Sequence, residues 1–157
     1  MKAPCNTVLF LCTGNYYRSR FAEEYFNALA PSRLSNWRAA SRALAIEMGV
    51  ANVGPISAHT LEELERRQYH AIEPDRKPLQ CTESDLQQAN LIIALKEAEH
   101  RPMLARRFPA WPDKVTYWHI HDVDQEQPIN GLREIARNVE QLMDELELYQ
   151  SQEEMVL

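Results

Sequence analysis

The sequence predicts an α/β domain built on a small doubly wound, four-stranded parallel sheet with helices on both of its faces. Two features lead to this prediction. Short, nearly continuous apolar runs such as 7–11 and 91–95 alternate with longer segments in which apolar residues recur every three or four positions. Such alternation of strands and helices is typical of parallel sheets, which need helices on both faces. The 157 residues suffice for one domain, which we expect over 1–150, with a frayed tail at 151–157.

The first strand and the first helix are joined by a short loop. Residues 7–11 predict a central strand, since this apolar run stops abruptly at Cys12. Ser19 can cap the helix that follows, and Pro31 should end that helix. The apolar residues of this helix recur at helical spacing: Phe21, Ala22, Tyr25, Phe26 and Leu29. Strand, tight loop and helix start therefore follow one another directly.

The remaining elements continue the same alternation. Further strands are expected at 36–41, 91–95 and 115–118. Helices are expected from Ser57 or Thr60 to Gln68, from Thr82 to Ala89, and from Glu97 to Phe108. Residues 69–81 contain two prolines and predict an extended surface connection. The last helix is the clearest, because apolar residues recur every three or four positions from Leu132 to Leu146 behind an Asn130 cap.

Charge and composition exclude several classes of function. The formal net charge is −6 and the 17 Lys and Arg residues are spread along the chain, so we expect no nucleic-acid partner. The basic group of Arg101, Arg106 and Arg107 is interpreted as a solvated helix face. No apolar run approaches the roughly 18 residues of a membrane-spanning helix, so no membrane partner is expected. No secretory signal is recognisable, which makes the cytoplasm the expected location. Nothing in the sequence indicates the oligomeric state.

The three cysteines, Cys5, Cys12 and Cys81, are an odd number without Cys-x-x-Cys spacing. This pattern argues against both a disulfide framework and a zinc site. We therefore expect neither a metal nor a cofactor. A reducing compartment also keeps a nucleophilic thiol available. The sequence leaves open whether Cys5 or Cys81 has a redox role.

The residues from Cys12 to Ser19 predict an anion-binding loop that carries a nucleophile. Five residues between Cys12 and Arg18 suffice to curl the backbone so that its N–H groups point to one centre, which suits a phosphate-like dianion. Arg18 would close this ring with a planar, bidentate guanidinium. A helix N-terminus, the N–H donors and the arginine all favour the nucleophilic thiolate. The simpler alternative is a buried strand-end cysteine beside a surface arginine, but a chance Cys-x5-Arg-Ser match is rare in a chain with three cysteines.

Residues 12–19 read Cys-Thr-Gly-Asn-Tyr-Tyr-Arg-Ser, and Phe-Ala-Glu follows at 21–23. This stretch resembles the signature loop of the low-molecular-weight protein tyrosine phosphatases, a family of cysteine-dependent phosphatases. The segment 36–41, the helix start and strand at 82–95, and the last helix also fall in the family's order. The resemblance covers nearly the whole chain, closely at the loop and loosely elsewhere, and it implies a phosphate-binding loop after the first strand.

The resemblance implies a two-step hydrolysis of phosphate monoesters, with phosphotyrosine or aryl phosphates as the expected substrates. Cys12 would attack phosphorus and form a phosphocysteine that water then cleaves, while Arg18 and the loop N–H groups stabilise the transition state. Ser19 would hydrogen-bond the sulfur and make it a better leaving group. Asn15 would fix a left-handed loop backbone, with Ser41 as its partner. The residues expected to contact the substrate or its phosphate are Thr13, Gly14, Asn15, Tyr16, Tyr17 and Ser19.

The family takes the proton for the leaving group from an aspartate in a loop near the C-terminus, usually in an Asp-Pro sequence beside aromatic residues. Here the loop 119–124 reads His-Ile-His-Asp-Val-Asp, so the proline and the adjoining tyrosines are missing. Counting back from Ile135 places Asp122 nearest to the family's general acid. Asp124 is the alternative, and the carboxylate that is not used would be an ordinary solvated one.

Two tyrosines in the loop also depart from the family's pattern. Tyr17 stands where relatives have a second cysteine, so the thiol that could protect an oxidised Cys12 as a disulfide is missing. Tyr16 either forms an aromatic wall of the substrate pocket or packs on the surface.

The histidines carry less information. His59 and His100 have no cluster of chemistry-bearing residues around them in the sequence and are interpreted as ordinary surface or capping residues. His119 and His121 differ only because they flank the proposed acid.

Two alternatives to a phosphatase remain open. Thioredoxin-linked arsenate reductases share this fold and loop, but they carry further cysteines after the third strand, where this chain has Lys-Glu-Ala-Glu at 96–99. The second alternative is a catalytically weak domain that only binds phosphorylated partners or free oxyanions. For the phosphatase reading, the expected partner is a phosphorylated protein or a small phosphate ester.

Overall fold

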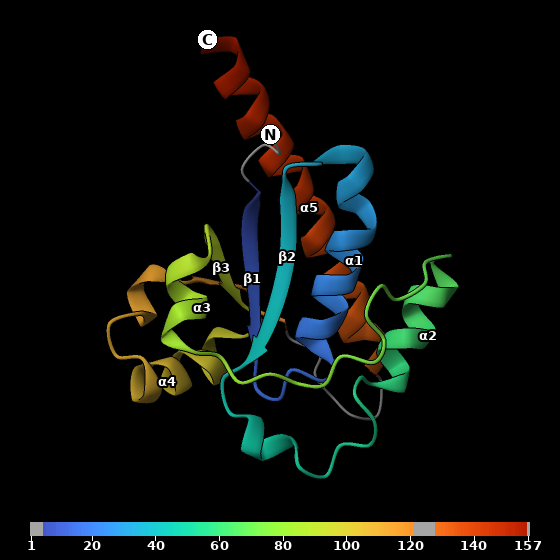
Figure 1. The fold of residues 1–157 in the computed structure, drawn as a ribbon, viewed down its shortest axis with the longest axis vertical. Coiled ribbons are helices and arrows are strands. Elements are labelled where there is room, and N and C mark those ends of the chain that lie inside the picture. The colour runs from blue at the N-terminus through green and yellow to red at the C-terminus, as the bar shows by residue number, and fades with distance from the viewer. Residues whose placement is uncertain (1–4, 121–127, 157) are drawn as a thin grey trace.

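A four-stranded parallel sheet forms the centre of the computed structural model, which describes residues 5–120 and 128–156 (Figure 1). The strands lie in the order β2-β1-β3-β4, and each neighbouring pair is parallel. They are β1 (Asn6–Cys12), β2 (Trp37–Ala43), β3 (Leu91–Ala94) and β4 (Thr116–Tyr117). The predicted class, a four-stranded parallel α/β fold, is confirmed.

Helices cover both faces of this sheet. They are α1 (Arg18–Arg33), α2 (Ala58–Arg66), α3 (Glu83–Gln88), α4 (Glu97–Arg107) and α5 (Pro128–Val156), with short 3-10 helices η1 (Ile46–Gly49) and η2 (Pro112–Lys114). On one face α1 packs against β2, α5 and α2, whereas α3 and α4 contact β1 and β3 on the other (Figure 1). The two helical layers explain why the central strands are apolar on both sides.

The central strand β1 sends alternate side chains into two separate cores, as the period of two in a strand requires. Val8, Phe10 and Cys12 join the core under α1 and α5. Leu9 and Leu11 join the core under α3 and α4. Cys12 is therefore the last residue of a strand that is buried from both faces, and packing holds its position.

The register of the sheet brings the ends of three strands to one edge. Cys12 lies opposite Ala43 of β2, and Leu11 lies opposite Ala94 of β3. The chain leaves β1 at this edge through residues 13–17 and enters α1. In Figure 1 the segment after β2 passes below this edge. Loops at the carboxyl ends of parallel strands are where ligands bind in such folds.

The start and end of α1 differ from the sequence-based expectation. The helix begins at Arg18, so Ser19 is its second residue and not its cap, and Tyr17 at the cap makes no side-chain capping bond. The Ser19 hydroxyl instead faces the sulfur of Cys12. Pro31 lies inside the helix and does not end it, because Leu34 N–H still reaches the carbonyl of Ala30 at 2.7 Å.

The capping expectations are met at two other helices. Ser57 caps α2 by accepting from His59 N–H, and Thr82 forms a capping box with Asp85 at the start of α3. At α5 the expectation was wrong, since the helix starts at Pro128 and Asn130 lies inside it.

The last helix continues to Val156 and includes residues 151–156, which were expected to fray. No glycine or proline follows Gly131 to stop it. Its C-terminal part extends past the sheet in Figure 1. Among the helices that the structure describes, none combines the length and apolar character that crossing a bilayer requires.

Candidate active site

Cys12 meets Ser19 across the loop between β1 and α1. The Sγ of Cys12 and the Oγ of Ser19 are 2.9 Å apart, and both residues are almost completely buried. Between them, Asn15 adopts a left-handed backbone with φ of 53°. Asparagine tolerates this conformation better than most residues, so the predicted role of Asn15 in turning the loop agrees with its geometry.

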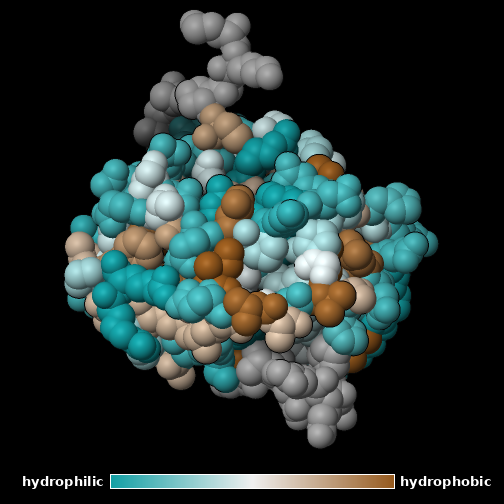
Figure 2. Space-filling model, turned by 60° about the horizontal axis from the view of Figure 1, so that its bottom comes forward, coloured by the Kyte–Doolittle hydropathy of each residue, from teal (hydrophilic) through white to brown (hydrophobic). Residues whose placement is uncertain are grey.

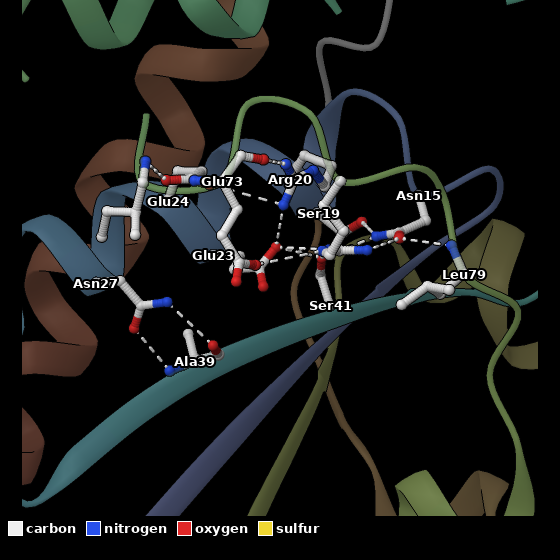
Figure 3. Close-up of polar contacts among 12 residues, drawn as sticks. Asn15, Ser19, Arg20, Glu23, Glu24, Asn27, Ala39, Ser41, Glu73 and Leu79 are labelled. Carbon is white, nitrogen blue, oxygen red and sulfur yellow. Dashed lines mark hydrogen bonds and ion pairs between the residues drawn. The ribbon is translucent and has the colours of Figure 1, made fainter. Parts of the chain in front are cut away.

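The side-chain amide of Asn15 makes all four of its possible hydrogen bonds (Figure 3). Its Oδ1 accepts from the backbone N–H of Leu79 and from Arg76, each at 3.1 Å. Its Nδ2 donates to Ser19 at 3.0 Å and to Ser41 at 2.8 Å. Because the N–H of Leu79 can only donate, the amide oxygen must face it, and the orientation of the amide follows. The structure thus brings the predicted partner Ser41 to Asn15.

These bonds determine what the hydroxyl of Ser19 can do. Ser19 Oγ accepts a hydrogen bond from Asn15, so its own proton remains available for another acceptor. The sulfur of Cys12 lies 2.9 Å away, which is a short distance for a bond to sulfur. A thiolate at Cys12 would therefore receive a directed O–H donor.

The half-buried Arg76 and the buried Glu23 form an outer layer behind Asn15. Arg76 Nη2 donates to Glu23 at 2.7 Å and to Ser41 at 2.9 Å, and Ser41 donates to Glu23 at 2.8 Å. Glu23 also accepts from Arg20, a fully buried arginine, at 2.6 Å. Arg76 belongs to the predicted extended connection 69–81, in which only a bridge at Gln80 is assigned. This connection therefore supplies a cation to the loop.

A second buried carboxylate completes the charge balance. Glu24 lies 3.7 Å from Arg20 and accepts from the backbone N–H groups of Ile72 and Glu73. Arg20 also donates to the carbonyl of Glu73 at 2.6 Å. Two buried glutamates thus face two arginines, which offsets the cost of burying these charges.

Arg18 pairs with Glu99 at the exposed side of the loop. Its Nη1 and Nη2 donate to the two carboxylate oxygens of Glu99 at 3.1 and 3.0 Å. Burial raises the pKa of Glu99, but the hydrogen bonds and charge of Arg18 outweigh it and lower this pKa to about 2. Burial conversely lowers the pKa of Arg18, whereas Glu99 and Cys12 raise it, and the net direction is upward. Both groups of this pair are therefore charged at neutral pH.

Thr13 and His100 form hydrogen bonds next to this pair that hold Glu99 in place. Thr13 Oγ1 donates to Glu99 at 2.5 Å and lies 3.3 Å from Nε2 of His100. The Nδ1 of His100 accepts the backbone N–H of Lys96 at 3.1 Å, so the ring proton sits on Nε2 and points to Thr13. His100 is fully buried, and burial followed by the charge of Arg18 lowers its pKa to about 4. His100 is therefore not a surface residue, whereas its bond to the N–H of Lys96, the residue before α4, agrees with the capping alternative.

The rim of the loop is built by the segment between β2 and α2. Tyr16 donates its phenol O–H to the carbonyl of Val53 at 2.5 Å, and its own carbonyl accepts from the N–H of Ser57. Met48, Val50 and Val53 of this segment are exposed by 66 to 86%. On the face shown in Figure 2, hydrophobic residues form small separate groups among hydrophilic ones. Tyr16 is thus tied to a neighbouring segment and is neither buried nor fully exposed.

The predicted general acids Asp122 and Asp124 lie outside the described residues, as does His121. The described chain reaches this loop at Ile120, which is fully buried and bonds to Leu95. His119 pairs with Lys96 in an isolated bridge, so the loop leaves the sheet beside the start of α4. Among residues 5–120 and 128–156, no three His, Cys, Asp or Glu side chains are placed to hold a metal ion.

Six polar residues around the loop were not predicted from the sequence: Arg20, Glu23, Glu24, Arg76, Glu99 and His100. Glu23 follows Ser19 by four positions and so lies on the same helix face. Because that face is buried, the spacing between the two residues could have indicated that Glu23 lies near the loop. Arg76, Glu99 and His100 reach the loop only through the folded arrangement, and their neighbours in the sequence carry no motif.

Comparison with known proteins identifies the family. The family model for low molecular weight phosphotyrosine protein phosphatases matches residues 7–154. The chain belongs to this family, as the loop sequence suggested. A search of curated proteins finds no significant match.

Several solved structures share the fold of this chain. The low molecular weight protein tyrosine phosphatase of T. tengcongensis is 26% identical, with a TM-score of 0.73 over 89% of this chain and 99% of its own. YfkJ of Bacillus subtilis is 22% identical, with a TM-score of 0.78 over 95% and 99% of the two chains. The YwlE arginine phosphatase of Geobacillus stearothermophilus is 24% identical, with a TM-score of 0.69 over 96% of each.

Proposed function

We propose that this protein is a cysteine-dependent phosphatase that hydrolyses phosphate monoesters through a phosphocysteine intermediate. The observation that carries the proposal is the directed chain from Asn15 through Ser19 to Cys12, at the N-terminus of a helix whose first residue is Arg18. A chain of donors aimed at a buried sulfur suits a thiolate. A buried structural cysteine would not need one.

In the first step, the thiolate of Cys12 attacks phosphorus and the bond from phosphorus to the ester oxygen breaks. The leaving oxygen takes a proton from Asp122, with Asp124 as the alternative acid. Arg18 and the N–H groups of the loop stabilise the charge on the equatorial oxygens.

In the second step, water attacks the phosphocysteine and transfers a proton to the same aspartate. The bond from phosphorus to sulfur breaks, and the thiolate of Cys12 returns together with inorganic phosphate. The O–H of Ser19 would stabilise sulfur as it regains its negative charge, since Asn15 leaves that proton free to point there.

The substrate class is an aryl phosphate or phosphotyrosine in our proposal. The family's description as phosphotyrosine protein phosphatases supports it. The likeness to an arginine phosphatase makes phosphoarginine the substrate to compare. We also place the activity in the cytoplasm, because reducing conditions keep Cys12 as a thiol.

Arsenate reduction is less well supported, because it needs a second thiol that can relay oxidation. Burial, followed by the charge of Asp85, raises the pKa of Cys81 to about 12, so this thiol stays protonated. Cys81 also packs in the core under α3 and α4, whereas Cys12 packs in the other core. Arsenate-dependent disulfide formation between Cys12 and Cys81 would favour the reductase instead.

The deciding experiment measures release of phosphate from an aryl phosphate, a phosphotyrosine peptide and a phosphoarginine peptide. We expect steady turnover of the first two, competitive inhibition by vanadate, and loss of turnover in Cys12→Ser and Arg18→Ala. Acid quenching of the parent should trap phosphate on Cys12 in mass spectrometry. Phosphate binding without turnover by the parent would instead indicate a binding module, and faster release from phosphoarginine would reassign the substrate.

A further inference from the structure

Arg18 and Glu99 meet in a geometry that leaves part of the arginine for another anion. Both Nη atoms of Arg18 donate to the carboxylate of Glu99, so the guanidinium binds the carboxylate end-on with two hydrogen bonds. A guanidinium has five N–H donors on different edges. The end-on pair uses one hydrogen of each Nη, so the edge formed by Nε and the second hydrogen of one Nη does not take part in it. Such an edge binds a phosphate side-on with two parallel hydrogen bonds.

The carboxylate of Glu99 is itself fixed by hydrogen bonds, unlike an ordinary surface carboxylate. Thr13 donates to Glu99 at 2.5 Å, and the Nε2–H of His100 points to Thr13. His100 is anchored in turn by the backbone of Lys96 at the start of α4. The side chain of Arg18 is 13% exposed and that of Glu99 is 29% exposed. The pair is therefore linked to the loop directly after β1 through Thr13, and through Thr13 to the buried His100 of α4.

We propose that Glu99 is the positioning residue for Arg18 in the reaction, holding the outer end of its guanidinium so that the remaining edge faces the phosphoryl group. The inference rests on the proposed phosphatase function. It assigns to α4, through Glu99, Thr13 and His100, a part in placing the arginine that the loop sequence itself does not specify. A long, flexible arginine needs such support, because errors of about 1 Å in a catalytic group can cost about 100-fold in rate.

The alternative role of the Arg18–Glu99 ion pair is inhibition, in which Glu99 binds the guanidinium of Arg18 and phosphate must displace the Glu99 carboxylate. The two roles predict opposite results. A positioning residue contributes most in the transition state, where the oxygens of phosphorus move into one plane. A blocking residue weakens the binding of every oxyanion, and its removal would speed turnover.

The experiment compares inhibition by vanadate, which resembles the transition state, with inhibition by inorganic phosphate, which resembles the product. Glu99→Gln removes a negative charge, which affects the binding of both anionic probes in the same direction. This effect largely cancels in the ratio of the inhibition constant for phosphate to that for vanadate. We expect this ratio to fall by about tenfold and kcat to fall more than KM rises. Glu99→Asp keeps the charge but is one methylene shorter, so it should resemble Glu99→Gln. The control Glu97→Gln, on the same turn of α4 and paired at 4.0 Å with Arg101, should keep the ratio of the parent.

Each other outcome overturns the inference. A parent-like ratio in Glu99→Gln, or faster turnover, would show that Glu99 does not position Arg18. A parent-like Glu99→Asp would show that only the charge matters. These ratios come from active molecules, so a partly unfolded variant does not change them. If Arg18→Ala retains activity or the parent does not turn over, the proposed function fails, and this inference fails with it. Loss in Arg18→Ala with a parent-like Glu99→Gln overturns this inference alone.

Discussion

The guanidinium of Arg76 donates to the amide oxygen of Asn15 at 3.1 Å, although 61 positions separate the two residues in the sequence. Arg76 is thereby part of the structure that turns the loop after β1, because it occupies one of the two acceptor positions of the Asn15 oxygen. The same guanidinium reaches Glu23 and Ser41. One side chain from an irregular segment thus joins the loop, α1 and β2.

Arg76→Met should reduce both stability and activity. The change leaves Glu23 with one cation fewer and frees one lone pair of Asn15, so we expect the free energy of unfolding to fall by on the order of 3 kcal/mol. Chemical denaturation and kcat/KM for an aryl phosphate measure the two effects. Arg66→Met is the matched control, since Arg66 also pairs with a glutamate but is half exposed. Parent-like stability and activity in Arg76→Met would contradict the importance of this contact.

Ser19→Ala should slow the second chemical step more than the first. The variant removes the only side-chain O–H donor that the described residues place at the sulfur of Cys12. Rapid mixing with an activated aryl phosphate should then show a burst of phenol followed by turnover slower by about 10². If the rate of the burst and the steady-state rate fall by the same factor, Ser19 assists the attack of Cys12 on phosphorus and not the hydrolysis of the phosphocysteine.

Asp122→Asn should slow poor leaving groups far more than activated ones. Only a basic alkoxide or phenolate needs a proton as it leaves, so we expect a loss of about 10² with a phenyl phosphate and a much smaller loss with a nitrophenyl phosphate. Asp124→Asn is the comparison, and both residues lie outside the described part of the chain. A larger leaving-group dependence in Asp124→Asn would transfer the role of general acid to Asp124.

Oxidation of Cys12 should not end in a disulfide with Cys81. The pKa of Cys81 is raised to about 12, chiefly by burial, so its thiol cannot attack a sulfenic acid efficiently at neutral pH. After treatment with peroxide, peptide mass spectrometry should find Cys12 as sulfinic acid, and dithiothreitol should restore only part of the activity. A Cys12 to Cys81 disulfide with complete recovery would refute this expectation.

The buried His100 should make the protein less stable as the pH falls. Its pKa in the folded protein is about 4, against an ordinary value of 6.5, because of burial and the charge of Arg18. Between these two values the unfolded chain binds a proton that the folded chain does not, so the free energy of unfolding decreases as pH drops from 6.5 to 4. Thermal melts of His100→Gln should show a shallower decrease than the parent. His59→Gln, at an exposed histidine, should keep the slope of the parent.

Prediction from sequence worked best where a local pattern matched a local structure. The apolar run before Cys12 formed β1, and the Thr82 capping signature started α3. Prediction was wrong where one side chain could form either of two local hydrogen bonds. The residue pattern predicted that Ser19 caps α1, but the helix begins two residues earlier than such a cap requires, at Arg18. The Ser19 hydroxyl faces Cys12, as the resemblance to the family implied.

The sequence by itself determined the alternation of strands and helices, the position of Cys12 at the end of a strand, and the loop that leads to Arg18. These features depend on residues that are neighbours in the chain. Only the tertiary structure decided which side chains surround the loop: Glu23 and Arg76 behind Asn15, and Glu99 with His100 beside Arg18. Parallel strands bring segments that are far apart in sequence to one edge, and buried charges there must find partners, so these contacts are chosen by packing and electrostatics across the fold.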